Sequence, residues 1–78
     1  MSEHIKAINS FFSTALKPEV DLLVEQLMLS DRQTDIFYRF YIRKQDRNFI
    51  ADELGMSSDS VAKELKKVRK KIVKALGY

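Results

Sequence analysis

Ten lysine and arginine side chains between residues 43 and 78 are the groups in this chain best suited to binding another molecule. Five acidic side chains accompany them, giving this part a net charge of +5, whereas residues 1–42 hold four basic and six acidic side chains, a net of −2. Ammonium and guanidinium groups neutralise phosphates and donate hydrogen bonds to base edges. The asymmetry favours an anionic partner, nucleic acid being the commonest, although a lysine-rich helix can equally be a solvated face.

The sequence offers no comparable set of groups for catalysis or for metal binding. It has no cysteine and one histidine, His4, so neither a thiolate nor an imidazole metal site can be assembled. There are no paired carboxylates near a histidine, no nucleophile beside a base and no glycine-rich phosphate loop. We therefore expect no enzymatic activity, no catalytic residue, no metal and no cofactor.

Length and hydropathy indicate the class of protein. Seventy-eight residues, 45% of them hydrophobic, fit a single domain over residues 1–78 with one modest core. Nowhere do eighteen apolar residues occur together, and the first twelve residues lack the basic region and apolar run of a signal peptide. With the absence of cysteine, these features predict a cytoplasmic protein without membrane contact.

Apolar spacing and cap residues predict an all-α fold, a small bundle of four to five helices. Ser2 is the expected cap of the first helix, and Pro18 ends that helix and opens the second, which makes residues 2–28 a helical hairpin. The expected core residues are Ile5, Ile8, Phe12 and Leu16 on the first helix and Val20, Leu23, Val24 and Leu27 on the second.

The third predicted helix begins with a capping box formed by Ser30 and Gln33, followed by a crowd of large side chains. Four of these within six residues are more than a solvated helix would tolerate, so we expect this helix at the centre of the domain. Its core face is predicted to hold Ile36, Phe37, Phe40 and Tyr41.

Two further helices are predicted on either side of Gly55. Asp46 caps a helix of about two turns, Arg47 to Leu54, and Gly55 ends it in the left-handed conformation that glycine adopts at little cost. Ser57 caps the last helix, and Met56 packs on Val61 as a hydrophobic staple. The predicted inward residues are Phe49, Ile50 and Leu54, then Val61, Leu65, Val68, Ile72 and Leu76.

Two helices joined by a glycine-containing turn of about three residues form a helix-turn-helix arrangement, in which the second helix enters the major groove. The joint pattern I-A-x-x-L-G-M-S-x-x-S-V fits it position by position, with small Ala51 allowing the two helices to approach closely. The sequence therefore predicts a C-terminal helix-turn-helix.

The segments "LSDRQTDIFYRFYI" and "FIADELGMSSDSVAKELKKVRKKI" together resemble the fourth region of bacterial sigma factors, which reads the −35 promoter element. They are also similar to the related DNA-binding domain of LuxR-type regulators. Leu29, Ser30, Arg32 and Gln33 match the leucine, cap and Arg-Gln pair that open a scaffold helix in that family. The resemblance covers residues 27–76 and implies DNA binding by residues 29–76, with RNA polymerase as a further partner to consider.

The chain also departs from that family. Seventy-eight residues leave no room for the region that melts the −10 element, so we do not expect a complete sigma factor. Asp59 and Glu64 place acidic groups on a helix that many relatives make strongly basic, so the DNA sequence read need not be a −35 element. The glycine that relatives often have before the fourth helix is missing from "RKQDRN".

The last helix should reach bases with its early outward residues and phosphates with its later ones. Ser58 can meet a base edge, Lys63 and Lys66 guanine, and Ala62 a thymine methyl, while Asp59 either accepts from cytosine or only favours the helix dipole. Lys67, Lys70 and Lys74 should meet phosphates. The expected DNA-binding residues are Arg43, Lys44, Arg47, Ser57, Ser58, Asp59, Ala62, Lys63, Lys66, Lys67 and Lys70.

The leading functional hypothesis is a sequence-specific, nucleoid-associated transcription regulator that inserts residues 57–76 into the major groove of double-stranded DNA. The alternative is an adaptor that binds RNA polymerase or a sigma factor and holds DNA only weakly. The sequence leaves open whether residues 2–28 form a homodimer interface or complete the core of a monomer.

Overall fold

The computed structural model describes the backbone of residues 2–77 and the side chains of residues 6–77. These residues form five α-helices and one π-helical segment and contain no strand, so the predicted all-α fold is confirmed. Of the sequence predictions, the cap at Ser2 and the buried position of Ile5 concern side chains outside this description. The elements are α1 (Ser2–Thr14), α2 (Lys17–Leu27), α3 (Asp31–Phe37), η1 (Tyr38–Ile42), α4 (Arg47–Leu54) and α5 (Ser58–Ala75).

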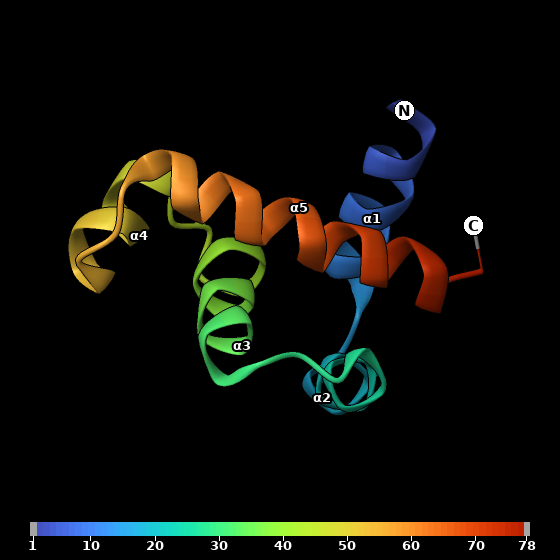
Figure 1. Cartoon of the computed structure of the whole chain (residues 1–78). Coiled ribbons are helices and arrows are strands. Elements are labelled where there is room, and N and C mark those ends of the chain that lie inside the picture. Colours follow the sequence, from blue (N-terminus) through green and yellow to red (C-terminus); the bar gives the residue numbers. More distant parts are fainter. Residues whose placement is uncertain (1, 78) are drawn as a thin grey trace.

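The long C-terminal helix α5 is the axis on which the other helices pack. It runs across the whole view in Figure 1 and contacts α1, α2, α3 and α4. Its buried side carries Val61, Leu65, Val68 and Ile72, as their spacing of three and four residues predicts. Leu76 lies just beyond the helix end and is half-buried. Because α5 supplies a buried residue on every turn, its other side is left for solvent or for a partner.

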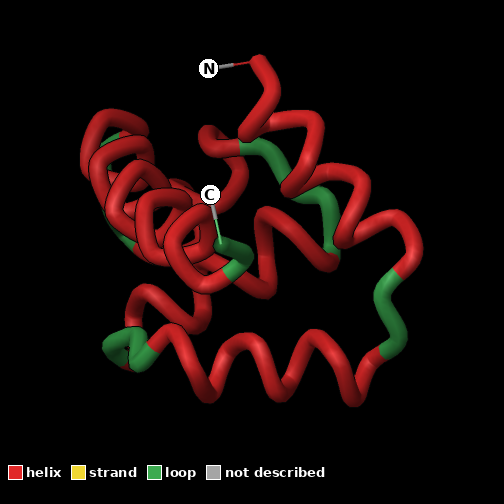
Figure 2. The backbone as a smooth tube through the Cα atoms, turned by 90° about the vertical axis from the view of Figure 1, so that its right-hand side faces the viewer, coloured by secondary structure: helices red, strands yellow, loops and turns green. Residues whose placement is uncertain are grey.

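The two N-terminal helices pack mainly on α5 rather than along each other. Figure 2 shows them joined by a short loop and running in different directions. Ile8, Val20, Leu23 and Leu27 are buried as predicted. Leu16, predicted to be buried, is 68% exposed. The prediction was wrong because α1 ends at Thr14 and Leu16 has the extended backbone of the residue before a helix.

The central helix begins as predicted and then changes its winding. Ser30 Oγ accepts from the backbone N–H of Gln33 at 3.1 Å, and Gln33 Oε1 accepts from the N–H of Ser30 at 3.2 Å. After Phe37 the chain continues as the π-helical η1, in which the N–H of Arg43 donates to the carbonyl of Tyr38 at 2.9 Å. A π-helical turn holds more residues than an α-helical turn, so the side chains along η1 rotate away from the α-helical register.

This change of winding separates the four large residues predicted for the core face. Ile36 and Phe37 are fully buried and Tyr41 is 8% exposed, but Phe40 is only half-buried. The rings still form one cluster with α1, since Phe12 stacks on Tyr41 with ring centroids 5.1 Å apart. Phe40, predicted for the core face, therefore packs against the core but is not fully buried, as it would be on a regular α-helix.

The connection between α4 and α5 follows the predicted capping pattern. Asp46 Oδ1 accepts from the N–H of Phe49 at 2.9 Å, and Gly55 ends α4 with φ 65° and ψ 34°, the left-handed conformation. Ala51 is buried, which allows α5 to approach, and Met56 packs against the core. Phe49, predicted to face inward, is 48% exposed. It lies one residue, about 100° of helix rotation, before the buried Ile50 and so falls off the narrow apolar side of this short helix.

Within residues 2–77, no helix is long and apolar enough to cross a membrane.

Candidate nucleic-acid interface

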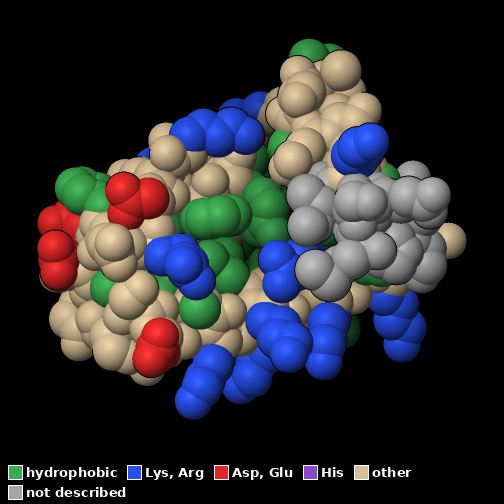
Figure 3. Space-filling model, turned by 90° about the horizontal axis from the view of Figure 1, so that it is seen from above, with side chains coloured by type: hydrophobic (Ala, Val, Ile, Leu, Met, Phe, Trp, Pro, Cys, Tyr) green, Lys and Arg blue, Asp and Glu red, His purple; other side chains and the backbone are tan. Residues whose placement is uncertain are grey.

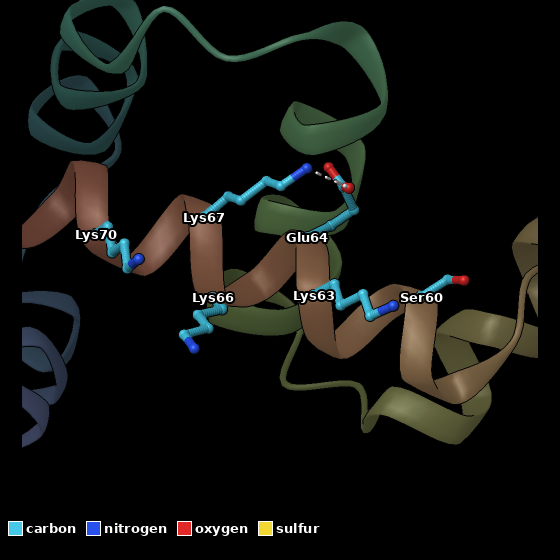
Figure 4. A pocket seen from close by; sticks show the side chains of 6 residues that line it. All are labelled: Ser60, Lys63, Glu64, Lys66, Lys67 and Lys70. Carbon is cyan, nitrogen blue, oxygen red and sulfur yellow. Dashed lines mark ion pairs between the residues drawn. The ribbon is translucent and has the colours of Figure 1, made fainter.

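The exposed side of α5 carries a row of lysines. Lys63, Lys66, Lys70 and Lys74 are all exposed and lie opposite the buried residues of this helix. Figure 4 shows the side chains of Lys63, Lys66 and Lys70 extending from the helix, with Lys66 and Lys67 directed to opposite sides. With Ser60, Glu64 and Lys67, the first three of these lysines line an open hollow of about 330 Å³. The outward face predicted for this helix is thus the face that the fold leaves uncovered.

One flank of α5 is tied to the rest of the chain. Glu64 is half-buried; its Oε1 accepts from Gln33 Nε2 at 3.1 Å and its Oε2 lies 3.5 Å from Lys67 Nζ, the pair drawn in Figure 4. One helical turn further on, Lys71 Nζ donates to the carbonyl of Met28 at 3.4 Å. Glu64 therefore pairs with the neighbouring Lys67 and partly offsets its charge.

Ser57, one of the predicted site residues, caps the N-terminal end of α5. Ser57 Oγ accepts from the N–H of Ser60 at 3.1 Å and lies 2.9 Å from Ser60 Oγ, so this hydroxyl is occupied within the chain. Ser58 is half-buried, whereas Asp59 is exposed in the first turn, where a carboxylate is stabilised by the helix dipole. Lys63, one turn later, is the first exposed cation of the helix.

The three basic residues between the end of η1 and the start of α4, Arg43, Lys44 and Arg47, are placed differently from one another. Arg47, at the start of α4, lines a hollow together with Ala62 and Lys66 of α5, so the fold brings these predicted site residues together. Lys44 has a left-handed backbone, φ 60°, and lines a different hollow, beside Lys17 of α2. Arg43 is exposed at the end of η1.

Charged groups next to Lys44 are already paired. Asp21 Oδ2 lies 3.0 Å from Lys17 Nζ, and its Oδ1 accepts from the hydroxyl of Tyr38 at 2.9 Å. Hydrogen bonds from Lys17 and then from Tyr38 lower the pKa of Asp21 below its usual value. This arrangement holds α2 to η1 and places an acidic group in the hollow that Lys44 lines, which makes Lys44 a weaker candidate for an anion contact than Arg47.

The hollow between η1, α4 and α5 contains a cation that the sequence did not single out. It measures about 420 Å³ and is lined by Phe40, Tyr41, Arg47, Ala62, Leu65, Lys66 and Arg69. Arg69 lies seven residues after Ala62 and three after Lys66, so helical spacing alone could have placed it on this flank. Burial raises the pKa of Tyr41, while the charge of Arg69, which lines the same hollow, acts to lower it.

Apart from Asp59 and Glu64, the acidic side chains of the C-terminal half lie on α4 or at its N-terminal cap, away from the lysine row. Arg39, which is 18% exposed, pairs with Asp35 at 2.9 Å and with Glu53 of α4 at 3.8 Å. In Figure 3, acidic side chains gather over the α4 end, while Lys and Arg side chains follow α5 and border an apolar area on the upper face. Glu53 is thus paired within the chain.

In the part of the chain that the structure describes, no group of three histidine, cysteine or acidic side chains is placed to hold a metal ion. Comparison of the chain with protein-family models, with curated proteins and with solved structures finds no match. The function must therefore be argued from the geometry of this surface.

Proposed function

We propose that the protein binds double-stranded DNA in a sequence-specific manner, as a small transcription regulator that inserts the N-terminal part of α5 into the major groove. The observation that carries this proposal is the lysine row on the uncovered side of α5, next to a tight turn from α4. An α-helix fits the width of the major groove, and lysine donates to guanine O6 and N7 or neutralises phosphates.

The turn before α5 supports this orientation. Gly55 closes α4 in the left-handed conformation, and only Met56 and Ser57 separate it from the first residue of α5. Such a short connection fixes α5 against α4, and the burial of Val61 and Leu65 holds its outer side toward solvent. These features support the proposed helix-turn-helix, a motif in which the second helix presents its early residues to base edges.

One observation favours a second candidate, an adaptor that binds RNA polymerase or a sigma factor. Phe49 on α4 is 48% exposed, and Ile42 at the end of η1 is 41% exposed. Exposed aromatic side chains are common anchors of protein interfaces. Scattered apolar residues are also normal on protein surfaces, so we rank this candidate second.

Selection from a random DNA pool, followed by sequencing, tests the proposal. We expect the purified protein to enrich a defined motif at moderate salt without polymerase, and to retard that duplex more strongly than a scrambled one. The Lys63→Ala variant should weaken this preference. Lys6→Ala, which removes an exposed cation of α1, is the control and should keep it.

Two results would contradict the proposal. Failure to enrich any motif would remove sequence-specific binding, and capture of the protein by polymerase or a sigma factor in the same preparation would then support the adaptor. Equal loss of affinity in the control variant would mean that the protein responds to total charge and not to the lysine row.

A further inference from the structure

We propose that the hollow between η1, α4 and α5 is a binding site for a DNA phosphodiester, with Arg47, Lys66 and Arg69 as its cations. This inference rests on the proposed function and makes it more specific, because it assigns the DNA backbone to one flank of α5. The site takes a phosphodiester as its ligand and adds Arg69, which the sequence pattern did not single out, to the predicted interface.

The positive charge of the hollow favours binding of an anion. Its lining includes three cations and no acidic side chain. Within the described residues, none of the three cations forms an ion pair. Like charges placed around a partly apolar hollow repel one another, and an anion seated between them removes that repulsion.

The shape and position of the hollow fit a phosphate that belongs to a duplex. Lys66 belongs both to this hollow and to the lysine row, so a strand contacting the row also reaches the hollow. Phe40, Tyr41 and Leu65 also line the hollow and provide apolar surface, against which the sugar next to a phosphate can pack. Guanidinium groups match phosphate oxygens with two parallel donors, and two of the three cations are arginines.

On the opposite flank of α5, the cations already have partners within the chain. There Lys67 faces the carboxylate of Glu64, and Lys71 donates to the carbonyl of Met28. A strand approaching this flank would meet a half-buried acidic group and cations already engaged by the chain. The two flanks therefore differ in their attraction for a polyanion, and the duplex should lie toward Arg69.

This asymmetry provides a matched pair of variants. Arg69 and Lys71 are both exposed cations at nearly the same depth along α5. We expect Arg69→Gln to weaken binding to specific and scrambled duplexes alike by about fivefold to tenfold, and to lower the slope of log affinity against log salt by about one unit. Lys71→Gln should change affinity by less than about twofold. Arg69→Lys should retain the salt slope, and thermal unfolding should show that all variants fold.

Neutralising single phosphates locates the contact. Methylphosphonate scanning of the wild-type duplex should find one position at which removing the charge weakens binding at least as much as Arg69→Gln does. The same substitution should cost less affinity in the Arg69→Gln variant than in the wild-type protein, because one of the three cationic partners of that phosphate is already missing. Arg47→Gln should show the same lack of additivity.

The outcomes separate this inference from the proposed function. If the wild-type protein binds no duplex, both fail. If it binds and Arg69→Gln and Lys71→Gln lose affinity equally, or if no methylphosphonate position couples to Arg69, DNA binding stands and the phosphodiester site is overturned. Binding of an acidic peptide that requires Arg69 while DNA affinity is unchanged would also overturn it.

Discussion

At the scale of single residues, the lysines of α5 differ in how far the folded chain already uses their charge. Lys67 and Lys71 have partners within the chain, whereas Lys63, Lys66 and Lys70 form no ion pair with any described residue. A count of positive charges treats all of them alike. Their partners and their distance from the N-terminal end of α5 predict different roles.

Lys63 and Lys70 should show this difference in a binding experiment. Lys63 lies in the second turn of α5, where a helix inserted by its N-terminal end meets base edges, and Lys70 lies about two turns later. We expect Lys63→Ala to cost about 1–3 kcal/mol on the preferred site and to relax selectivity at one base pair. Lys70→Ala should weaken all duplexes similarly and lower the salt slope by about one unit.

Titrations of both variants against specific and scrambled duplexes at several salt concentrations measure these effects. Equal losses for the two variants, independent of DNA sequence, would contradict insertion by the N-terminal end. They would not by themselves contradict DNA binding.

At the scale of elements, the segment formed by α3 and η1 supplies the buried aromatic residues of the core. Phe37 is fully buried, and its ring lies 5.5 Å from Phe12 of α1 and 5.6 Å from Tyr41, measured between centroids. Phe40 is half-buried in the same segment and borders the cationic hollow. Replacing each of these two residues with alanine therefore compares the loss of a fully buried ring with the loss of a half-buried one.

Phe37→Ala should lower the free energy of unfolding by about 3–5 kcal/mol, because it leaves a cavity among rings that cannot all move inward. Phe40→Ala should cost about 1–2 kcal/mol, since part of its ring already contacts water in the folded protein. Chemical denaturation of both variants measures the difference. Equal costs would mean that η1 packs more tightly than its exposure indicates.

The elements also show what could be predicted from the sequence. Caps and breaks are local: Ser30, Asp46, Gly55 and Ser57 act within three or four residues of themselves, and the structure places each as predicted. The π-helical winding after Phe37 could not be predicted, because its backbone hydrogen bonds depend on how η1 packs against its neighbours.

The candidate site was predictable to a similar degree. The lysine row follows from helical spacing, since a buried residue on every turn determines the opposite face. The separation of Lys44 from Arg47, and the meeting of Arg47 with Arg69, depend on how η1 directs the chain into α4. Periodicity within one helix carries no information on such contacts between elements.

At the scale of the whole molecule, residues 2–28 complete the core of one chain. Ile8 from α1 and Val20, Leu23 and Leu27 from α2 are buried in the same cluster as the residues of α3, α4 and α5. These helices are thus part of the domain that holds α5 in place. Their principal apolar residues are already used within the chain, although Leu16 and Leu22 remain exposed, at 68% and 57%.

We therefore predict that the free protein is a monomer and that its selected DNA motif has no two-fold symmetry. A homodimer would engage two half-sites related by such symmetry, with centres about 34–36 Å apart or a multiple of that distance. Analytical ultracentrifugation gives the mass in solution, and the random-pool selection gives the symmetry of the motif. A dimer that Leu22→Glu dissociates, together with a palindromic motif, would show instead that the exposed leucines of the N-terminal helices form an interface.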